Sequence, residues 1–303
     1  MKLGRKNRKT ESSPRKGKRL KHIAFLPSFI TLINGACGFI ALLVASHGYF
    51  ALAGYIILGA MVADVLDGRV ARLTRTTSSF GGQLDSLSDA ISFGVAPGFI
   101  MIKLIEYHLE CLGFADLDFS LLLGRIIVVS AVLYAMCAVV RLARFNVENE
   151  EDEAAHMNFA GLPSPAAAGV VVSLIIFHRQ ILPSITDEAS RIFHISSIIA
   201  FPLITIFAGI LMVSRIRYPH VANQLLRSKK SLAVLLLIFA TGLLIVWNIQ
   251  FALVLGFCGY ALFGILRWIV GLFRKRGGQR AEGREQRAEN REQGTAHGEQ
   301  GAG

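Results

Sequence analysis

Long apolar blocks constrain the fold of this chain more than any other feature of its sequence. Hydrophobic residues make up 53% of the 303 residues. They gather in blocks of about 20 residues, the length that a helix needs to cross a bilayer. We therefore expect an all-α fold, a polytopic membrane helical bundle with about eight transmembrane helices. The expected spans are residues 25–46, 48–66, 84–107, 121–140, 164–182, 194–214, 231–248 and 251–272.

Positive charge alternates with these spans. The net charge is +11, and ten of the lysines and arginines lie within the first 21 residues. Most of the others follow the second, fourth, sixth and eighth expected spans. The positive-inside rule then predicts an integral protein of the cell (inner) membrane with both termini in the cytoplasm. We expect the basic cytoplasmic arm, residues 1–22, to contact membrane lipids and not nucleic acid. The Gly/Gln/Arg/Glu-rich tail, residues 275–303, should be disordered and cytoplasmic.

Four aspartates, Asp64, Asp67, Asp85 and Asp89, lie in or beside apolar spans. A carboxylate at membrane depth is costly and usually has a function there. Four of them close together would repel one another unless cations neutralised them. Oxygen-only ligands favour Mg²⁺ or Mn²⁺, and paired carboxylates on two helices suit two ions. The aspartates therefore predict a divalent-metal site inside a membrane enzyme.

Residue spacing predicts that the acids face one another. One stripe of the second expected helix carries Asp64, Asp67, Gly68, Ala71 and Arg72, and one stripe of the third carries Ser78, Gly81, Asp85 and Asp89. A short link makes the two helices antiparallel neighbours. The small residues would let a flat ligand approach the backbone, although close helix packing is an alternative explanation. Arg72 could bind a phosphate or anchor the topology.

The complete pattern, D-x2-D-G-x2-A-R-x8-G-x3-D-x3-D, resembles the signature of the CDP-alcohol phosphatidyltransferases, and every fixed position matches. The resemblance implies that Asp64, Asp67 and Asp85 are metal ligands and that Asp89 is a ligand and the general base. It places Gly68, Ala71, Arg72, Ser78 and Gly81 in the CDP-lipid pocket. It also implies a six-helix catalytic core within residues 23–220, two additional helices within 221–274, and a homodimer.

Three further segments are similar to the membrane-embedded phosphatidylserine synthases of this family: residues 141–146, 159–167 and 212–219. They imply CDP-diacylglycerol and L-serine as substrates, with phosphatidylserine and CMP as products. Asn34, in the first span, could bind a polar group of the CDP-lipid or form a helix–helix hydrogen bond. Arg141 or Arg144 could bind the serine carboxylate, or both could anchor the topology.

Two alternatives remain open from the sequence. The first keeps the family but changes the acceptor to glycerol 3-phosphate, inositol phosphate or choline. The second is a cation transporter whose acids line an ion path. A transporter predicts acids spread over several helices and depths, whereas these four gather on two neighbouring helices.

Overall fold

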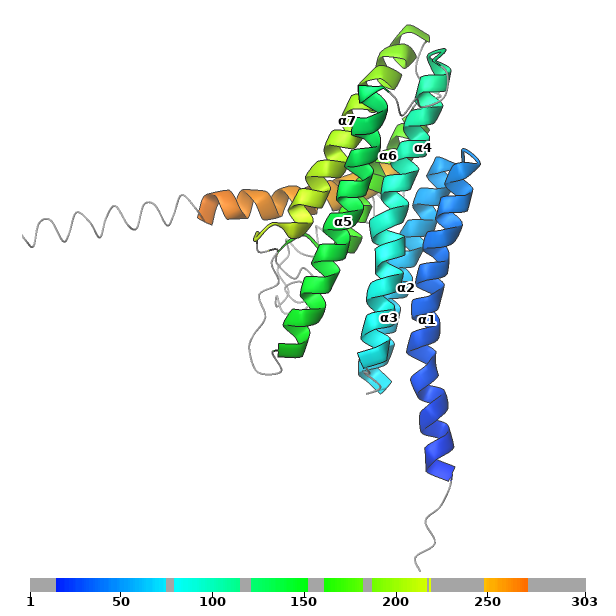
Figure 1. Cartoon of the computed structure of the whole chain (residues 1–303), viewed down its shortest axis with the longest axis vertical. Coiled ribbons are helices and arrows are strands. Elements are labelled where there is room, and N and C mark those ends of the chain that lie inside the picture. The colour runs from blue at the N-terminus through cyan, green and yellow to red at the C-terminus, as the bar shows by residue number, and fades with distance from the viewer. Residues whose placement is uncertain are drawn as a thin grey trace, which may run out of the picture. The chain divides into compact units, whose positions relative to one another are not determined.

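The computed structural model describes residues 15–74, 79–114, 121–151, 161–181, 187–216, 218 and 248–271, with side-chain environments from residue 28 onward. All regular structure in these residues is helical, which confirms the predicted all-α class (Figure 1). The α-helices are α1 (Arg15–Ser46), α2 (Phe50–Thr74), α3 (Ser79–Asp89), α4 (Ala96–Cys111), α5 (Leu122–Glu151), α6 (Ser164–Ile181) and α7 (Asp187–Val213). A six-residue π-helix, η1 (Ala90–Val95), joins α3 to α4, and a further helix covers Ile249–Gly271.

Six described helices are long and apolar enough to cross a membrane, which indicates an integral membrane protein. They are Ser28–Ser46, Phe50–Val70, Phe80–Cys111, Leu122–Val147, Arg191–Val213 and Ile249–Gly271. The predicted count of eight is not supported. The predicted span 164–182 corresponds to α6, which is 18 residues long, ends with basic residues and is not among the six. The predicted span 231–248 lies outside the described residues, apart from Asn248.

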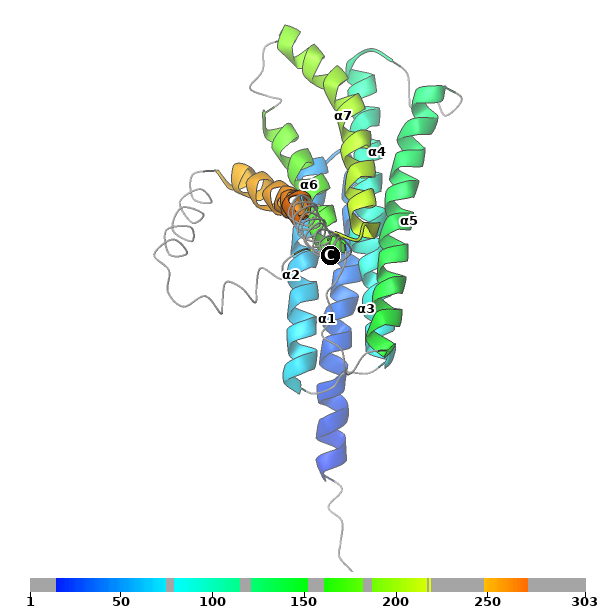
Figure 2. The same cartoon turned by 90° about the vertical axis from the view of Figure 1, so that its left-hand side faces the viewer.

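The chain divides into two compact units. The first comprises residues 1–155 and 163–213 and contains α1 to α7. Within it, α1 packs along α2, α5 along α7, and α2 along α6 (Figures 1 and 2). The second comprises residues 156–162 and 214–303. There the ring of Tyr218 packs on that of Tyr260, from the Ile249–Gly271 helix, with centroids 5.5 Å apart.

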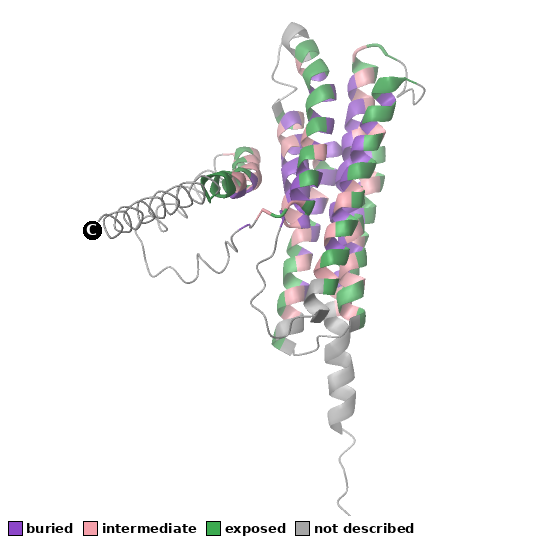
Figure 3. Ribbon diagram, turned by 60° about the vertical axis from the view of Figure 1, so that its left-hand side comes forward, coloured by how far each residue is buried: buried purple, intermediate pink, exposed green. Residues whose placement is uncertain are grey.

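The helices of the first unit bury one face and expose the other (Figure 3). The exposed faces carry large apolar side chains, among them Ile192 and Ile199, while the buried faces carry many alanines. Such outward apolar faces suit a lipid solvent, in which helices pack through small residues. Gly98 illustrates this packing, since a Cβ added there would lie 3.2 Å from the carbonyl oxygen of Ala131 on α5.

The π-helix η1 has a local cause and a specific partner. In an α-helix the carbonyl of Phe93 would accept a bond from the amide of residue 97, but Pro97 has no N–H. The buried Tyr134 hydroxyl, from α5, donates to this carbonyl at 2.9 Å. Pro97 therefore interrupts the helical hydrogen bonding shortly after Asp89. The Tyr134 hydroxyl from α5 satisfies the Phe93 carbonyl that lacks an amide donor.

Three buried histidines join α4, α6 and α7 at the far end of the first unit. The Nδ1 atoms of His108 and His194 are in contact, and the rings of His108 and His178 lie with centroids 4.8 Å apart. His108 is 23 residues beyond Asp85 along α3, η1 and α4. At 1.5 Å per residue, this places it roughly 35 Å from the acidic residues.

Candidate active site

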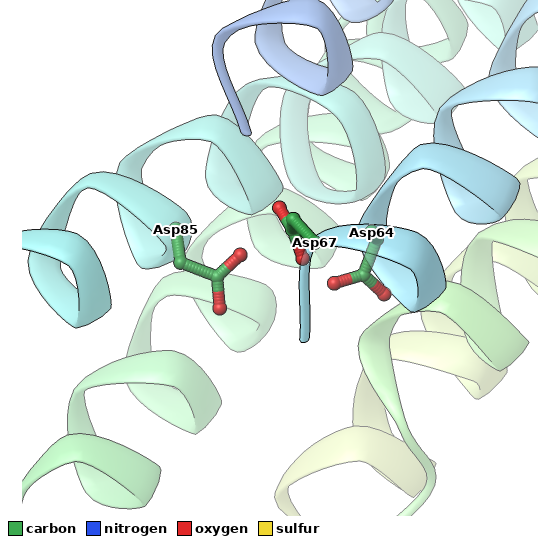
Figure 4. Close-up of side chains that lie close together, drawn as sticks. All are labelled: Asp64, Asp67 and Asp85. Carbon is green, nitrogen blue, oxygen red and sulfur yellow. The ribbon is translucent and has the colours of Figure 1, made fainter. Parts of the chain in front are cut away.

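Three of the four predicted metal ligands come together. Asp64 and Asp67 lie near the end of α2, and Asp85 lies on α3. One carboxylate oxygen from each lies within 4.8 Å of the others. The three carboxylates point toward a common region in Figure 4. The spacing of three residues puts Asp64 and Asp67 on one face of α2, and that face is turned toward Asp85.

These carboxylates fit a divalent cation. Asp67 Oδ2 and Asp85 Oδ1 are buried and have no hydrogen-bond partner among the described residues. Buried oxygens without donors are destabilising, and several negative charges within a few ångströms are more so. A bound cation would satisfy both the oxygens and the charge, and an all-oxygen set is what Mg²⁺ and Mn²⁺ prefer.

Asp89 lies beside this group and not within it. It is 7% exposed and lies within electrostatic range of Asp64 and Asp85. Its Oδ1 accepts a hydrogen bond from Asn34 Nδ2 at 2.9 Å. Of the two roles predicted for Asn34, the structure thus contains the helix–helix hydrogen bond, and its partner is the expected general base.

Helix α1 connects both acid-bearing helices, a role that the sequence analysis missed. Thr31 hydrogen-bonds to Asp67 on α2, while Asn34 bonds to Asp89 on α3. Both residues are buried, and their spacing of three puts them on one face of α1. The sequence signal was present, because Thr31, Asn34, Gly35 and Gly38 follow the i, i+3, i+4, i+7 spacing of one helical stripe.

The glycines of this stripe allow α1 to approach very closely. A Cβ added at Gly35 would lie 3.1 Å from Ser88 Oγ, and one at Gly38 would lie 2.8 Å from the Cα of Ser92. Ser92 Oγ in turn donates to the Asn34 carbonyl at 2.8 Å. Close packing along this stripe therefore fixes how far α1 lies from α3 and η1, and so fixes the position of Asn34 relative to Asp89.

Arg141, one of the two arginines predicted to bind serine, lies beside the acids. Its Nη1 donates to the buried hydroxyl of Ser164 at 2.9 Å, and its charge acts on Asp64. Arg144 lies nearly one turn further along α5 and is exposed. Asn146 accepts a 3.0 Å bond from Ser86 and thus links α5 to α3, a contact that the sequence analysis also missed.

The residues predicted to line the CDP pocket lie around the end of α2 and the start of α3. A Cβ added at Gly68 would meet no atom of the described chain within 4 Å, so there is open space next to Asp67. Ala71 and Arg72 belong to the last turns of α2, and Gly81 lies in the first turn of α3. Ser78 lies outside the described residues.

The fold and the site define a polytopic membrane protein with a partly buried carboxylate cluster suited to divalent cations, built on two helices and connected by a third. The profile of the CDP-alcohol phosphatidyltransferase family matches residues 24–216. The chain belongs to this family, and the match covers all three of these helices except for the start of α1.

Curated relatives resemble the chain over most of its length. A CDP-diacylglycerol–serine O-phosphatidyltransferase of Helicobacter pylori is 31% identical over 245 residues, which are 80% of this chain and 90% of that protein. A protein of the same name from Methanocaldococcus jannaschii is 32% identical over 83% of this chain and 98% of its own length. An archaetidylserine synthase of Methanothermobacter thermautotrophicus is 32% identical over 67% of this chain and 73% of its own length.

Proposed function

We propose that this protein transfers the phosphatidyl group of CDP-diacylglycerol to the hydroxyl of L-serine, giving phosphatidylserine and CMP. One observation carries the proposal. Three of the four carboxylates at the family's signature positions, those of Asp64, Asp67 and Asp85, converge within 4.8 Å, and relatives that align over most of this chain bear the name of this activity. A lipid donor also explains why such a site lies among membrane helices.

Asp64, Asp67 and Asp85 would hold the metal, with Asp89 beside them, and two Mg²⁺ or Mn²⁺ ions suit four carboxylates. When bound, the ions supply positive charge to the phosphoryl oxygens of the donor. The buried oxygens of Asp67 and Asp85 that have no described partner support this assignment. The open space at Gly68 would admit the CDP moiety beside the cluster. The family resemblance assigns Arg72 and Ser78 to the pyrophosphate.

Asp89 acts as general base in this proposal. Its carboxylate takes the proton of the serine hydroxyl, and the hydroxyl oxygen forms a bond to the phosphorus that carries diacylglycerol. The bond from that phosphorus to the bridging oxygen breaks, and CMP leaves with the electron pair. The bond from Asn34 occupies one carboxylate oxygen of Asp89 and leaves Oδ2 for the hydroxyl.

Arg141 is the better candidate to bind the serine carboxylate. It lies between Asp64 and Ser164, whereas Arg144 is exposed. A guanidinium can bind a carboxylate in a bidentate manner while keeping another bond. The basic residues at the ends of the spans favour a cytoplasmic active site in the cell (inner) membrane. The family resemblance favours a homodimer.

The test is an acceptor panel. Purified protein would receive CDP-diacylglycerol with L-serine, glycerol 3-phosphate, inositol phosphate or choline, and CMP and lipid products would be measured with and without EDTA. We expect phosphatidylserine from serine alone, abolished by chelation and restored by Mg²⁺ or Mn²⁺. Asp89→Asn should abolish it, whereas Glu106→Gln, a carboxylate bound to Lys103 on α4, should not.

Two results would contradict the proposal. Product from a different acceptor would keep the family chemistry but change the substrate. Metal flux into proteoliposomes without any CMP release would instead favour the transporter alternative.

A further inference from the structure

Asn34 carries an unused hydrogen-bond acceptor next to the proposed general base. The residue is 0% exposed, its Nδ2 is bonded to Asp89 Oδ1, and its Oδ1 has no partner among the residues that the structure describes. The two amide atoms share one carbon, so the free oxygen lies beside the Asp89 carboxylate. An acceptor buried without a donor is destabilising unless a ligand or water supplies the donor.

The backbone of Asn34 is held against η1, and the bond to Asp89 fixes the orientation of its amide. The Asn34 backbone carbonyl accepts the Ser92 hydroxyl, and neighbouring Gly35 packs against Ser88. Reversing the amide would point its carbonyl oxygen at a carboxylate, which only accepts when ionised. The surrounding helices therefore hold Asn34 Oδ1 in one place.

The chemistry of this place favours a cationic donor. The Asn34 amide oxygen only accepts hydrogen bonds and carries partial negative charge, and the Asp89 carboxylate lies beside it. An ammonium group has three donors and no acceptor, so it matches such a place, whereas a carboxylate would be repelled. In serine, two carbon atoms separate the ammonium nitrogen from the hydroxyl oxygen. A serine whose hydroxyl lies at Asp89 would thus place its ammonium group near Asn34.

We propose that Asn34 Oδ1 binds the ammonium group of the acceptor amino acid while Asn34 Nδ2 positions Asp89 for the hydroxyl. This inference rests on the proposed function and deepens it. It makes Asn34 a specificity-determining residue for acceptors that carry an amine beside their hydroxyl. Arg141, whose charge acts on Asp64, would bind the carboxylate that shares the α-carbon with this ammonium group.

The test compares L-serine with 3-hydroxypropionate, which is serine without its ammonium group. The KM for serine and the inhibition constant of 3-hydroxypropionate would be measured for wild type and Asn34→Ala. We expect the KM for serine to rise about tenfold to a hundredfold, as for loss of a charge-assisted bond. The inhibition constant should change less than about threefold. The turnover number should also fall, because Asp89 loses its partner.

Controls separate this effect from misfolding. Thr205→Val removes the hydrogen-bonding group of another fully buried polar side chain, whose hydroxyl donates to the Phe201 carbonyl of its own helix, and should keep the wild-type KM. Stabilisation of the protein by Mn²⁺ in thermal melting reports an intact carboxylate cluster. Should Asn34→Ala lose that stabilisation, Asn34→Ser replaces it, since a serine can still donate to Asp89 but has no amide carbonyl.

The outcomes are distinct. A serine KM within about twofold of wild type, or an equal rise of KM and inhibition constant, overturns the role of Asn34 in binding the ammonium group. If the wild-type protein forms no phosphatidylserine, the proposed function and this inference fail together. If the wild-type protein forms phosphatidylserine, and Asn34→Ala still prefers L-serine to 3-hydroxypropionate as strongly as wild type does, only the inference fails.

Discussion

Gly38→Ala is expected to impair the site through the contact of residue 38 with Ser92. The added Cβ would lie 2.5 Å from Ser92 Oγ and 2.8 Å from Ser92 Cα. Ordinary van der Waals contact begins at 3.4 Å, so α1 and η1 must separate by roughly 0.5 Å or more, a form of overpacking. Because Asn34 lies on α1 with Gly38, and Asp89 directly precedes η1, the same movement pulls Asn34 from Asp89.

The magnitude follows from two effects. Overpacking of this kind costs about 1–3 kcal/mol of stability. The Asn34–Asp89 bond of 2.9 Å would lengthen toward the limit of hydrogen bonding. Misplacing a catalytic group by about 1 Å can cost about a hundredfold in rate. We therefore expect a lower Tm and a turnover number reduced by about tenfold to a hundredfold.

Two other glycines provide matched controls for this substitution. Gly59→Ala, on α2, adds a methyl group that meets no described atom within 4 Å, so Tm should hold or rise slightly. The nearest atom to the Cβ of Gly35→Ala is the movable Ser88 Oγ at 3.1 Å, while Ser88 Cα lies at an ordinary 3.5 Å, so this variant should fall between the two. Thermal melting and the rate of CMP release would be measured for all three. Equal effects of Gly38→Ala and Gly59→Ala would refute the idea that close approach of α1 sets the site geometry.

Three further predictions follow from contacts around the bundle. Asp85→Asn should reduce activity at least about a hundredfold, yet raise the Tm of EDTA-treated protein, since one of three converging charges is gone; a lower Tm would contradict the repulsion. Arg141→Ala should raise the KM for serine about tenfold and more than Arg144→Ala does, because the charge of Arg141 acts on Asp64 whereas Arg144 is exposed. Tyr134→Phe leaves the Phe93 carbonyl without its donor and should cost about 1–3 kcal/mol in unfolding measurements, and an unchanged stability would show that another group replaces the hydroxyl.

The sequence predicted the features that depend on spacing within one helix. A period of 3.6 residues was enough to place Asp64 and Asp67 on one face of α2, and the short link suggested that Asp85 would oppose them. Length and hydropathy located most of the membrane spans, because a helix needs about 20 apolar residues to cross a bilayer. The count of eight was less secure, because hydropathy alone does not separate a short buried helix such as α6 from a spanning one.

Features that depend on which helices meet were not predictable in this way. Periodicity shows that Thr31, Asn34 and Gly38 share a face of α1, but it does not say what that face contacts. The partner is set by packing of the whole bundle, in which α1 contacts both α2 and α3. Tyr134 is a similar case, since its role appears only when α5 brings it to the carbonyl opposite Pro97.

The type of residue that α1 contributes also bears on how the site can work. Thr31 and Asn34 donate hydrogen bonds to Asp67 and Asp89 without adding a charge. A lysine or arginine at either position would neutralise an acid and compete with metal for it. Neutral donors orient the carboxylates and keep the cluster negative. Arg141 lies close enough to act on Asp64, but a bond to Ser164 holds one end of its guanidinium. A divalent cation bound by Asp64, Asp67 and Asp85 would balance the negative charge that these neutral donors leave.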